Sequence, residues 1–245
     1  LNNESDRKLI GMMHKAITII QLKLEGQMIM RHPEFNMNDR LLFNYTDFEN
    51  KTVTIGENIY TLSDSFFPTV DPKDPYKLTK EEENIVNALH KSFRRSEKLK
   101  KHIKCIFRHG CVYTITNSNL LFHASVPLNA DGTLKEVFIK GMPYKGRLLF
   151  DKIGAMIREA YFGSDSKESQ EYARDYDWYL WCGENSPVFD KNKMATFEDY
   201  FILEKEAKKE IKGNYYALRD NEKVCDYILD EFGVTGEHRH IINGH

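Results

Sequence analysis

Two histidines stand where apolar runs end, and their chemical type and placement suit a metal site. His123 ends the apolar run 120–122 and is followed by two small residues, whereas His245 closes the segment 240–245 directly after a glycine. A neutral imidazole presented at the tip of a buried strand is well suited to ligate a metal ion. The alternative is a histidine that only packs or hydrogen-bonds in the core. Because two such segments occur, the sequence favours the metal site.

The elements around these histidines explain how residues so far apart in sequence could meet. A helix over 221–232 leads into a strand over 239–242, and a strand over 111–116 turns back antiparallel into the strand 120–123. In α/β proteins, ligands gather beyond the carboxyl ends of the strands. Two histidines at neighbouring strand tips can therefore converge on one site, and Gly244 would permit a close backbone approach there.

The first part of the chain is expected to be largely helical. An apolar stripe predicts a helix over 6–31, and its wide apolar surface is typical of a helix buried in a larger body. Apolar residues flanking a glycine turn predict a β-hairpin over 52–62. Thr79 and Glu82 form a capping box that starts a second helix, predicted to continue to Arg108.

Composition excludes several classes of function. The chain has 245 residues and a formal net charge of −2, so it has no global attraction to nucleic acid or to an anionic membrane surface. Its four cysteines lack metal-binding spacing and are typical of reduced thiols in a cytoplasmic protein. No apolar run approaches the roughly 20 residues that a bilayer requires.

Two further features allow both a functional and a structural interpretation. Basic residues fill the later turns of the helix that ends at Arg108, which could bind a phosphorylated ligand, although such a charge run is more typical of a solvated helix face. Two tryptophans and two tyrosines lie within 176–181, where they could cover a buried site or form an ordinary aromatic core.

The order of the histidine motifs resembles the last metal-binding motifs of the calcineurin-like metallophosphatases. That resemblance implies two metal ions held by Asp, His and Asn side chains. The earlier motifs of that superfamily, Asp-x-His, Gly-Asp-x-x-Asp-Arg-Gly and Gly-Asn-His, do not occur in this chain. Because the chain begins with Leu1 and ends on the motif histidine, we expect a fragment that lacks the N-terminal half of the catalytic domain.

Segments spread over almost the whole chain also resemble the class III, manganese-type fructose-1,6-bisphosphatases of bacteria. They occur in the family's order: Met13-His14-Lys15-Ala16-Ile17, Leu24-Glu25-Gly26-Gln27, Arg31-His32-Pro33-Glu34-Phe35, Met37-Asn38-Asp39-Arg40, Phe67-Pro68-Thr69-Val70-Asp71-Pro72, Asp74-Pro75-Tyr76-Lys77-Leu78-Thr79, Trp178-Tyr179-Leu180-Trp181 and His240-Ile241-Ile242-Asn243-Gly244-His245. One departure is Ala124, where the wider superfamily commonly has glycine.

The family resemblance implies an α/β fold, specifically a partial calcineurin-like metallophosphatase sandwich with a helical insertion. Residues 111–245 would form the C-terminal part of the metallophosphatase core. Residues 1–110 would form the mainly helical insertion with one β-hairpin, and sugar specificity would come from that insertion. Arg40 and the basic helix are candidates for that role.

The resemblance further implies a cytoplasmic phosphatase of gluconeogenesis, which converts fructose 1,6-bisphosphate to fructose 6-phosphate and phosphate. It would use a two-metal manganese centre, with His123 and His245 each as a metal ligand and His240 in a strand-entry or outer-sphere role. The general acid would lie in the missing half, so the isolated chain is predicted to be inactive. Its partners would be the sugar bisphosphate and the remainder of its own catalytic domain, with no nucleic acid and no membrane.

Two other functions stay open at this point. One is a metallophosphatase that acts on phosphoproteins or nucleotides instead of a sugar bisphosphate. The other is a non-catalytic helical interaction module whose histidines are structural.

Overall fold

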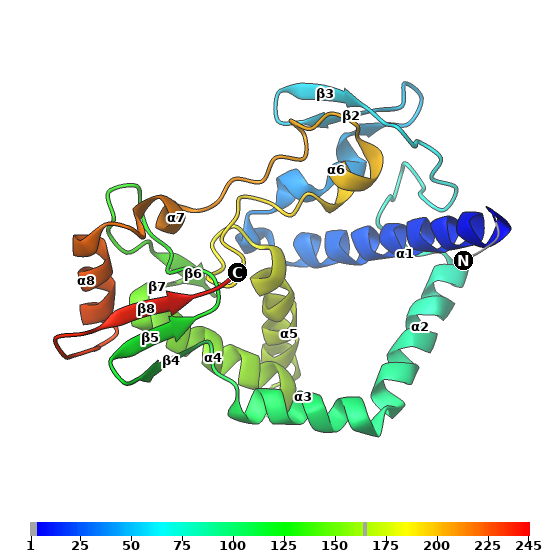
Figure 1. Cartoon of the computed structure of the whole chain (residues 1–245). Coiled ribbons are helices and arrows are strands. Elements are labelled where there is room, and N and C mark those ends of the chain that lie inside the picture. Colours follow the sequence, from blue (N-terminus) through cyan, green and yellow to red (C-terminus); the bar gives the residue numbers. More distant parts are fainter. Residues whose placement is uncertain (1–3, 164–165) are drawn as a thin grey trace. The chain divides into compact units, whose positions relative to one another are not determined.

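The computed structural model describes residues 4–163 and 166–245 and has the mixed α/β composition that the sequence predicts (Figure 1). The α-helices are α1 (Glu4–Arg31), α2 (Lys80–Arg95), α3 (Glu97–His109), α4 (Gly146–Phe162), α5 (Lys167–Cys182), α6 (Thr196–Phe201), α7 (Asn214–Leu218) and α8 (Glu222–Glu231). Short 3-10 helices are η1 (Pro33–Phe35), η2 (Asn38–Arg40) and η3 (Leu42–Tyr45). The strands are β1 (Thr46–Asp47), β2 (Thr52–Ile55), β3 (Asn58–Thr61), β4 (Tyr113–Thr116), β5 (Asn119–Phe122), β6 (Val137–Ile139), β7 (Met142–Tyr144) and β8 (His240–Asn243).

The chain forms two compact units. Unit 1 comprises Leu1–Glu97 and Ala195–Lys209, and unit 2 comprises Lys98–Met194 and Glu210–His245. The segment 195–209 returns to unit 1, and the break falls at the start of α3. Within the described ranges, no helix combines the length and the apolar character needed to span a lipid bilayer.

Unit 1 contains the predicted hairpin and a buried ion pair. Strands β2 and β3 pair antiparallel, and β1 adds to the outer side of β2. The Lys23 ammonium is fully buried and contacts the Glu82 carboxylate at 2.7 Å. Glu82 also completes the predicted capping box, since its carboxylate accepts a hydrogen bond from Thr79 N–H at 2.8 Å. One carboxylate thus links α1 to the start of α2.

Two helix predictions need correction. The helix expected to run unbroken to Arg108 is interrupted at Ser96, whose ψ of 97° leaves the helical region and separates α2 from α3. Serine favours helix ends because its hydroxyl offers the backbone alternative hydrogen bonds. The first helix is present, but its N-terminal half, including Leu9 and Met13, is exposed, and only its later turns from Thr18 onward carry buried residues.

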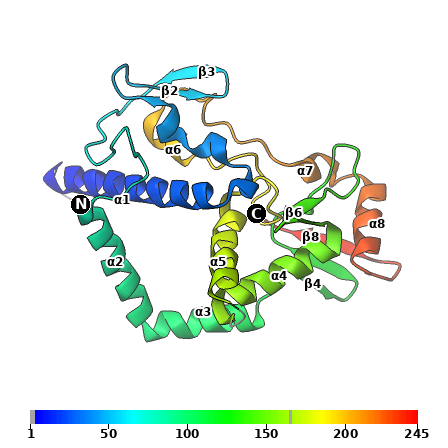
Figure 2. The ribbon, with the colours of Figure 1, turned by 180° about the vertical axis from the view of Figure 1, so that it is seen from behind.

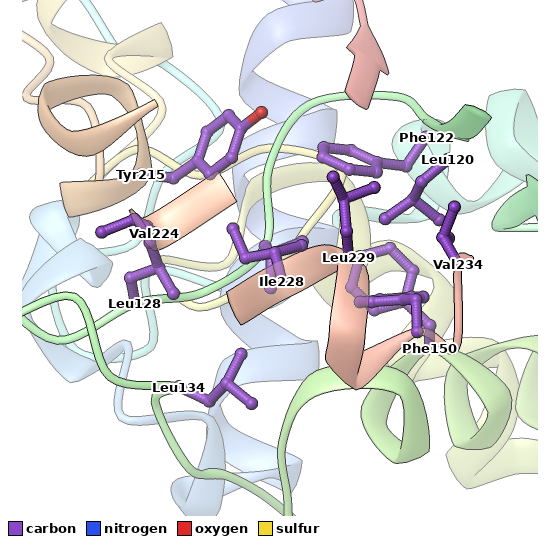
Figure 3. Close-up of a cluster of buried hydrophobic side chains, with 12 residues drawn as sticks. Leu120, Phe122, Leu128, Leu134, Phe150, Tyr215, Val224, Ile228, Leu229 and Val234 are labelled. Carbon is purple, nitrogen blue, oxygen red and sulfur yellow. The ribbon is translucent and has the colours of Figure 1, made fainter. Parts of the chain in front are cut away.

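Unit 2 contains the three-stranded sheet β4–β5–β8, which Figure 1 and Figure 2 show from opposite sides. Strand β4 pairs antiparallel with β5, as predicted, and β5 pairs parallel with β8. Buried side chains from β5, α4 and α8 gather into one cluster, which Figure 3 shows; its members are Leu120, Phe122, Val126, Leu128, Leu134, Phe150, Tyr215, Val224, Ile228, Leu229, Phe232 and Val234. Burial of this apolar surface holds α8 against the sheet and thereby fixes where β8 begins.

The Lys23–Glu82 pair gives a test of unit 1. Replacing Lys23 with Met leaves a buried carboxylate without its cation, so we expect a loss of roughly 3–5 kcal/mol in the free energy of unfolding. Native-state hydrogen exchange of the buried α1 amides measures that loss. Lys15→Met is the matched control, because the Lys15–Asp64 pair at 2.6 Å is partly exposed and is expected to contribute at most about 1 kcal/mol.

The Lys23–Glu82 pair also predicts that the stability of unit 1 depends on pH. Desolvation raises the pKa of Glu82, but the hydrogen bonds from Lys23, Thr69 and Thr79 outweigh it and leave the pKa below its ordinary value. The stabilisation is therefore present above the pKa of an unfolded glutamate and is lost as the pH falls through the lower folded pKa. Equal acid sensitivity of the original chain and a Glu82→Gln variant would contradict this assignment.

Candidate metal centre

Parallel pairing of β5 and β8 brings His123 and His245 to the same edge of the sheet. The register places Phe122 opposite Asn243, so the residues that follow both strands emerge side by side. The Gly244 N–H donates a hydrogen bond to the His123 carbonyl at 3.0 Å, which continues the pairing beyond the last strand residues. The predicted convergence of the two imidazoles at neighbouring strand tips is confirmed.

The two rings are in contact. His245 Nδ1 lies 3.4 Å from His123 Nε2, and the rings meet edge to face at 86° with centroids 5.3 Å apart. Both residues are exposed to solvent. A nitrogen separation of this size suits either a hydrogen bond or two imidazoles on one ion at about 2.1 Å each.

Asn243 fixes the two strand tips relative to each other. Its Nδ2 donates to the Ala124 carbonyl at 2.8 Å, and its Oδ1 accepts a hydrogen bond from the Tyr215 hydroxyl at 3.1 Å. Tyr215 is itself buried in the unit 2 core. The sequence shows Asn243 only as part of a histidine motif. Its positioning role depends on the loop after β5, which is distant in sequence, and could not be read from the motif.

The surroundings of His245 favour its neutral form. Partial burial of the ring lowers its pKa below the ordinary value, and neighbouring His123 and the charges of Lys191 and Lys212 act in the same direction. Neutral imidazole is the form that binds metals. Metal ligation by His245 stays a prediction.

His240 lies at the opposite end of the same strand. It pairs in register with Asn119, and its Nδ1 lies 3.2 Å from the Asn119 side-chain oxygen. This position supports the strand-entry role.

Gly244 needs no special backbone freedom, because an added Cβ would approach only the His123 carbonyl, at 3.9 Å.

A cavity of about 640 Å³ opens beside the histidine pair. Its lining is mostly apolar and includes Trp181 from α5, which is 67% exposed, together with Asp177 and Lys191. Tyr176 on the same helix is buried, so the aromatic cluster divides between core packing and the cavity wall. Burial raises the pKa of Asp177 to about 7. Sequence patterns did not single out this carboxyl group, because its desolvation arises from helix packing.

The histidine pair alone is an incomplete metal site. Among the residues that the structure describes, no group of three or more His, Cys, Asp or Glu side chains is arranged to hold a metal ion. Two adjacent, accessible imidazoles are suitable donors, but a two-metal centre requires additional ligands.

Known proteins resemble this chain over its whole length. The family model described as Firmicute fructose-1,6-bisphosphatase matches residues 1–245. The protein named fructose-1,6-bisphosphatase class 3 from Phocaeicola vulgatus is 62% identical over 244 residues, which cover 99% of this chain and 37% of that protein. Proteins of the same name from Parabacteroides distasonis and Clostridium novyi are 58% and 49% identical, and this chain covers 36% of each. The chain thus spans little more than a third of the length of these relatives. No solved structure matches it.

The Asn243 bridge can be tested by substitution. Asn243→Ala leaves the buried Tyr215 hydroxyl without its partner, so we expect a loss of about 1–3 kcal/mol in the free energy of unfolding of unit 2. Urea denaturation of the chain measures this. Asn119→Ala is the control, because the Asn119 side chain contacts only exposed groups, the turn carbonyls of 116 and 117 and the His240 ring, so its loss should cost much less. Equal losses of unfolding free energy in the two variants would contradict the positioning role of Asn243.

Proposed function

This chain belongs to the Firmicute fructose-1,6-bisphosphatase family, and on that premise we propose that it contributes to a metal-dependent phosphatase of gluconeogenesis. The substrate is fructose 1,6-bisphosphate and the products are fructose 6-phosphate and phosphate. The observation that carries the proposal is the match of the family model to every residue from 1 to 245. The contact between His123 and His245 supports it, because the two metal-site candidates meet at one sheet edge.

The proposed architecture is part of a calcineurin-like metallophosphatase sandwich. In this proposal, the β4–β5–β8 sheet of unit 2 belongs to the catalytic core, and residues before it form an insertion. The parallel β5–β8 pair supports this placement, since its carboxyl edge carries the histidines. Arg40, a candidate for sugar recognition, is instead engaged by Glu198 in unit 1 through two bonds of 2.9 and 2.8 Å.

Manganese is the proposed cofactor, with His123 and His245 among its ligands. A bound pair of divalent ions would neutralise charge on the phosphoryl group and lower the pKa of a bound water. Asn243 would hold the strand tips at the spacing that both imidazoles require. The remaining ligands and the general acid would come from residues outside this chain, since the relatives are nearly three times as long. The cytoplasm is the proposed location, which the free cysteines of the described chain support.

Activity measurements can separate the contribution of this chain from that of the rest of the enzyme. We expect the isolated chain to show no hydrolysis of fructose 1,6-bisphosphate with Mn²⁺. A chimera in which it replaces the matching segment of the Phocaeicola vulgatus relative is expected to be active, because the 62% identity covers 99% of the chain. Robust turnover by the isolated chain would contradict the proposed division of catalytic residues.

Substitutions in the chimera test the histidine pair. His123→Ala and His245→Ala are each expected to lower Mn²⁺ affinity and activity by more than about 100-fold, because even outer-sphere partners of metal ligands contribute 10–100-fold. His240→Ala is the control and should retain metal and activity. Metal content measured after dialysis decides the outcome. Unchanged metal in both ligand variants would favour a structural role for the pair.

A further inference from the structure

A second, polar pocket adjoins the cavity beside the histidine pair. It has a volume of about 150 Å³ and lies in unit 2 between the loop after β5 and the short segments 190–192 and 211–214. Lys191 lines both spaces, so the pocket and the cavity share one wall. Three lysines and three asparagines contribute to the pocket, and this gives it a chemical character different from that of the mostly apolar cavity. The lysines are Lys135, Lys191 and Lys212, and the asparagines are Asn185, Asn192 and Asn214.

Two of the lysines face each other across a short antiparallel bridge. Lys191 pairs with Lys212, and the bridge is held by a hydrogen bond from Asn192 N–H to the Ile211 carbonyl at 2.9 Å. Like charges placed directly opposite each other are destabilising. The Glu210 carboxylate lies 2.7 Å from the Lys191 ammonium and offsets its charge. The Lys212 ammonium instead lies 4.6 Å from the centre of the Tyr216 ring. An anion in the pocket would relieve the remaining repulsion.

Two buried polar groups in this region lack hydrogen bonds of normal geometry. Asp190 lines the pocket and is 5% exposed, and Ser125 is 0% exposed. Within the described chain, neither Asp190 Oδ2 nor Ser125 Oγ has a partner of normal hydrogen-bond geometry, although the two side chains lie close enough for Ser125 to lower the pKa of Asp190. A buried acceptor without a partner costs about 1–3 kcal/mol. A ligand hydroxyl is one group that could satisfy it.

The carboxylate is held in place by close backbone packing. A Cβ at Gly213 would overlap the Asp190 carboxylate, so only glycine leaves room for it. Burial raises the pKa of Asp190, although Ser125 and Lys135 act in the opposite direction. The pocket therefore presents fixed lysines to an anion and an oxygen acceptor to a hydroxyl group.

The polar pocket is linked to the histidine pair by ring contacts. The Tyr216 ring stacks on the His245 ring at 28°, with centroids 6.3 Å apart, and Lys212 lies over the same tyrosine. A ligand with an anionic group at each end and hydroxyl groups between them could reach from one site to the other. This is the chemistry of a sugar bisphosphate.

We propose that this pocket binds the phosphate group that is not hydrolysed, with Lys135 and Lys212 contacting the phosphate and Asp190 accepting a sugar hydroxyl. The inference rests on the proposed function, because it assigns the hydrolysed phosphate to the histidine pair. Lysine serves as a point-charge phosphate ligand, and charge-assisted hydrogen bonds are about twice as strong as neutral ones. The pocket thus selects a bisphosphate over a simple phosphomonoester.

Paired substrates test the proposal in the chimera. Lys135→Ala and Lys212→Ala are each expected to raise KM for fructose 1,6-bisphosphate by about 10-fold or more, because each removes a charge-assisted contact. The kcat/KM for p-nitrophenyl phosphate should change less than about 2-fold. This substrate has no second phosphate, so it makes no contact with these lysines that the substitutions could remove. Lys223→Ala, an exposed lysine of α8, is the control for both substrates. Equal losses for both substrates, or no change for either, would overturn the proposal.

A binding measurement keeps the inference separate from the proposed hydrolysis. Fructose 6-phosphate carries only the retained phosphate, and its affinity can be measured by calorimetry on the metal-free chimera with chelator present. We expect Lys135→Ala and Lys212→Ala to weaken this binding by about 10-fold or more, with Lys223→Ala unchanged. Asp190→Asn should weaken it less, and thermal melting establishes that each variant is folded. Unchanged binding in both lysine variants would overturn the pocket assignment even if the chimera is an active phosphatase.

Discussion

The parallel pairing of β5 with β8 is the constraint on which the candidate site depends. The two histidines are 122 residues apart in sequence, and only the register between these strands brings their rings together. A shift of one residue would turn each side chain to the other face of the sheet and separate the pair. The buried cluster beneath β5 and α8 resists such a shift, and Asn243 ties the tips together where the strands end.

Local patterns were sufficient to predict the elements that carry the site. Apolar runs ending in His123 and His245 indicated strand tips, and the α/β arrangement indicated that such tips could converge. The roles of Asn243, Asp177 and the lysine pocket could not be predicted in the same way. Each depends on groups brought together by packing: a carbonyl in a distant loop, a desolvated helix face and two short segments in antiparallel contact. The break at Ser96 was missed because the basic and apolar pattern continues across it.

The distribution of charge distinguishes the two units. In unit 1, the Arg40 guanidinium and the Lys23 ammonium are both engaged by carboxylates, so these cations contribute to folding. In unit 2, Lys191 is likewise engaged by Glu210, whereas the Lys212 ammonium lies over the Tyr216 ring, and the charges of both lysines lower the pKa of His245. Positive charge placed beside a neutral imidazole favours an anionic ligand. The lysine pocket, and not the helical insertion, is accordingly where sugar-phosphate recognition is proposed.

The contact between the two imidazoles can be measured directly by nuclear Overhauser spectroscopy on this chain with isotope-labelled histidine. We expect a cross-peak between the ring protons of His123 and His245, and none from His240 to either ring. Detection of the His240 contact with Asn119 provides an internal reference, because those side chains meet at the other end of the same strands. If that reference contact appears without the His123–His245 cross-peak, the shared site at the strand tips is contradicted.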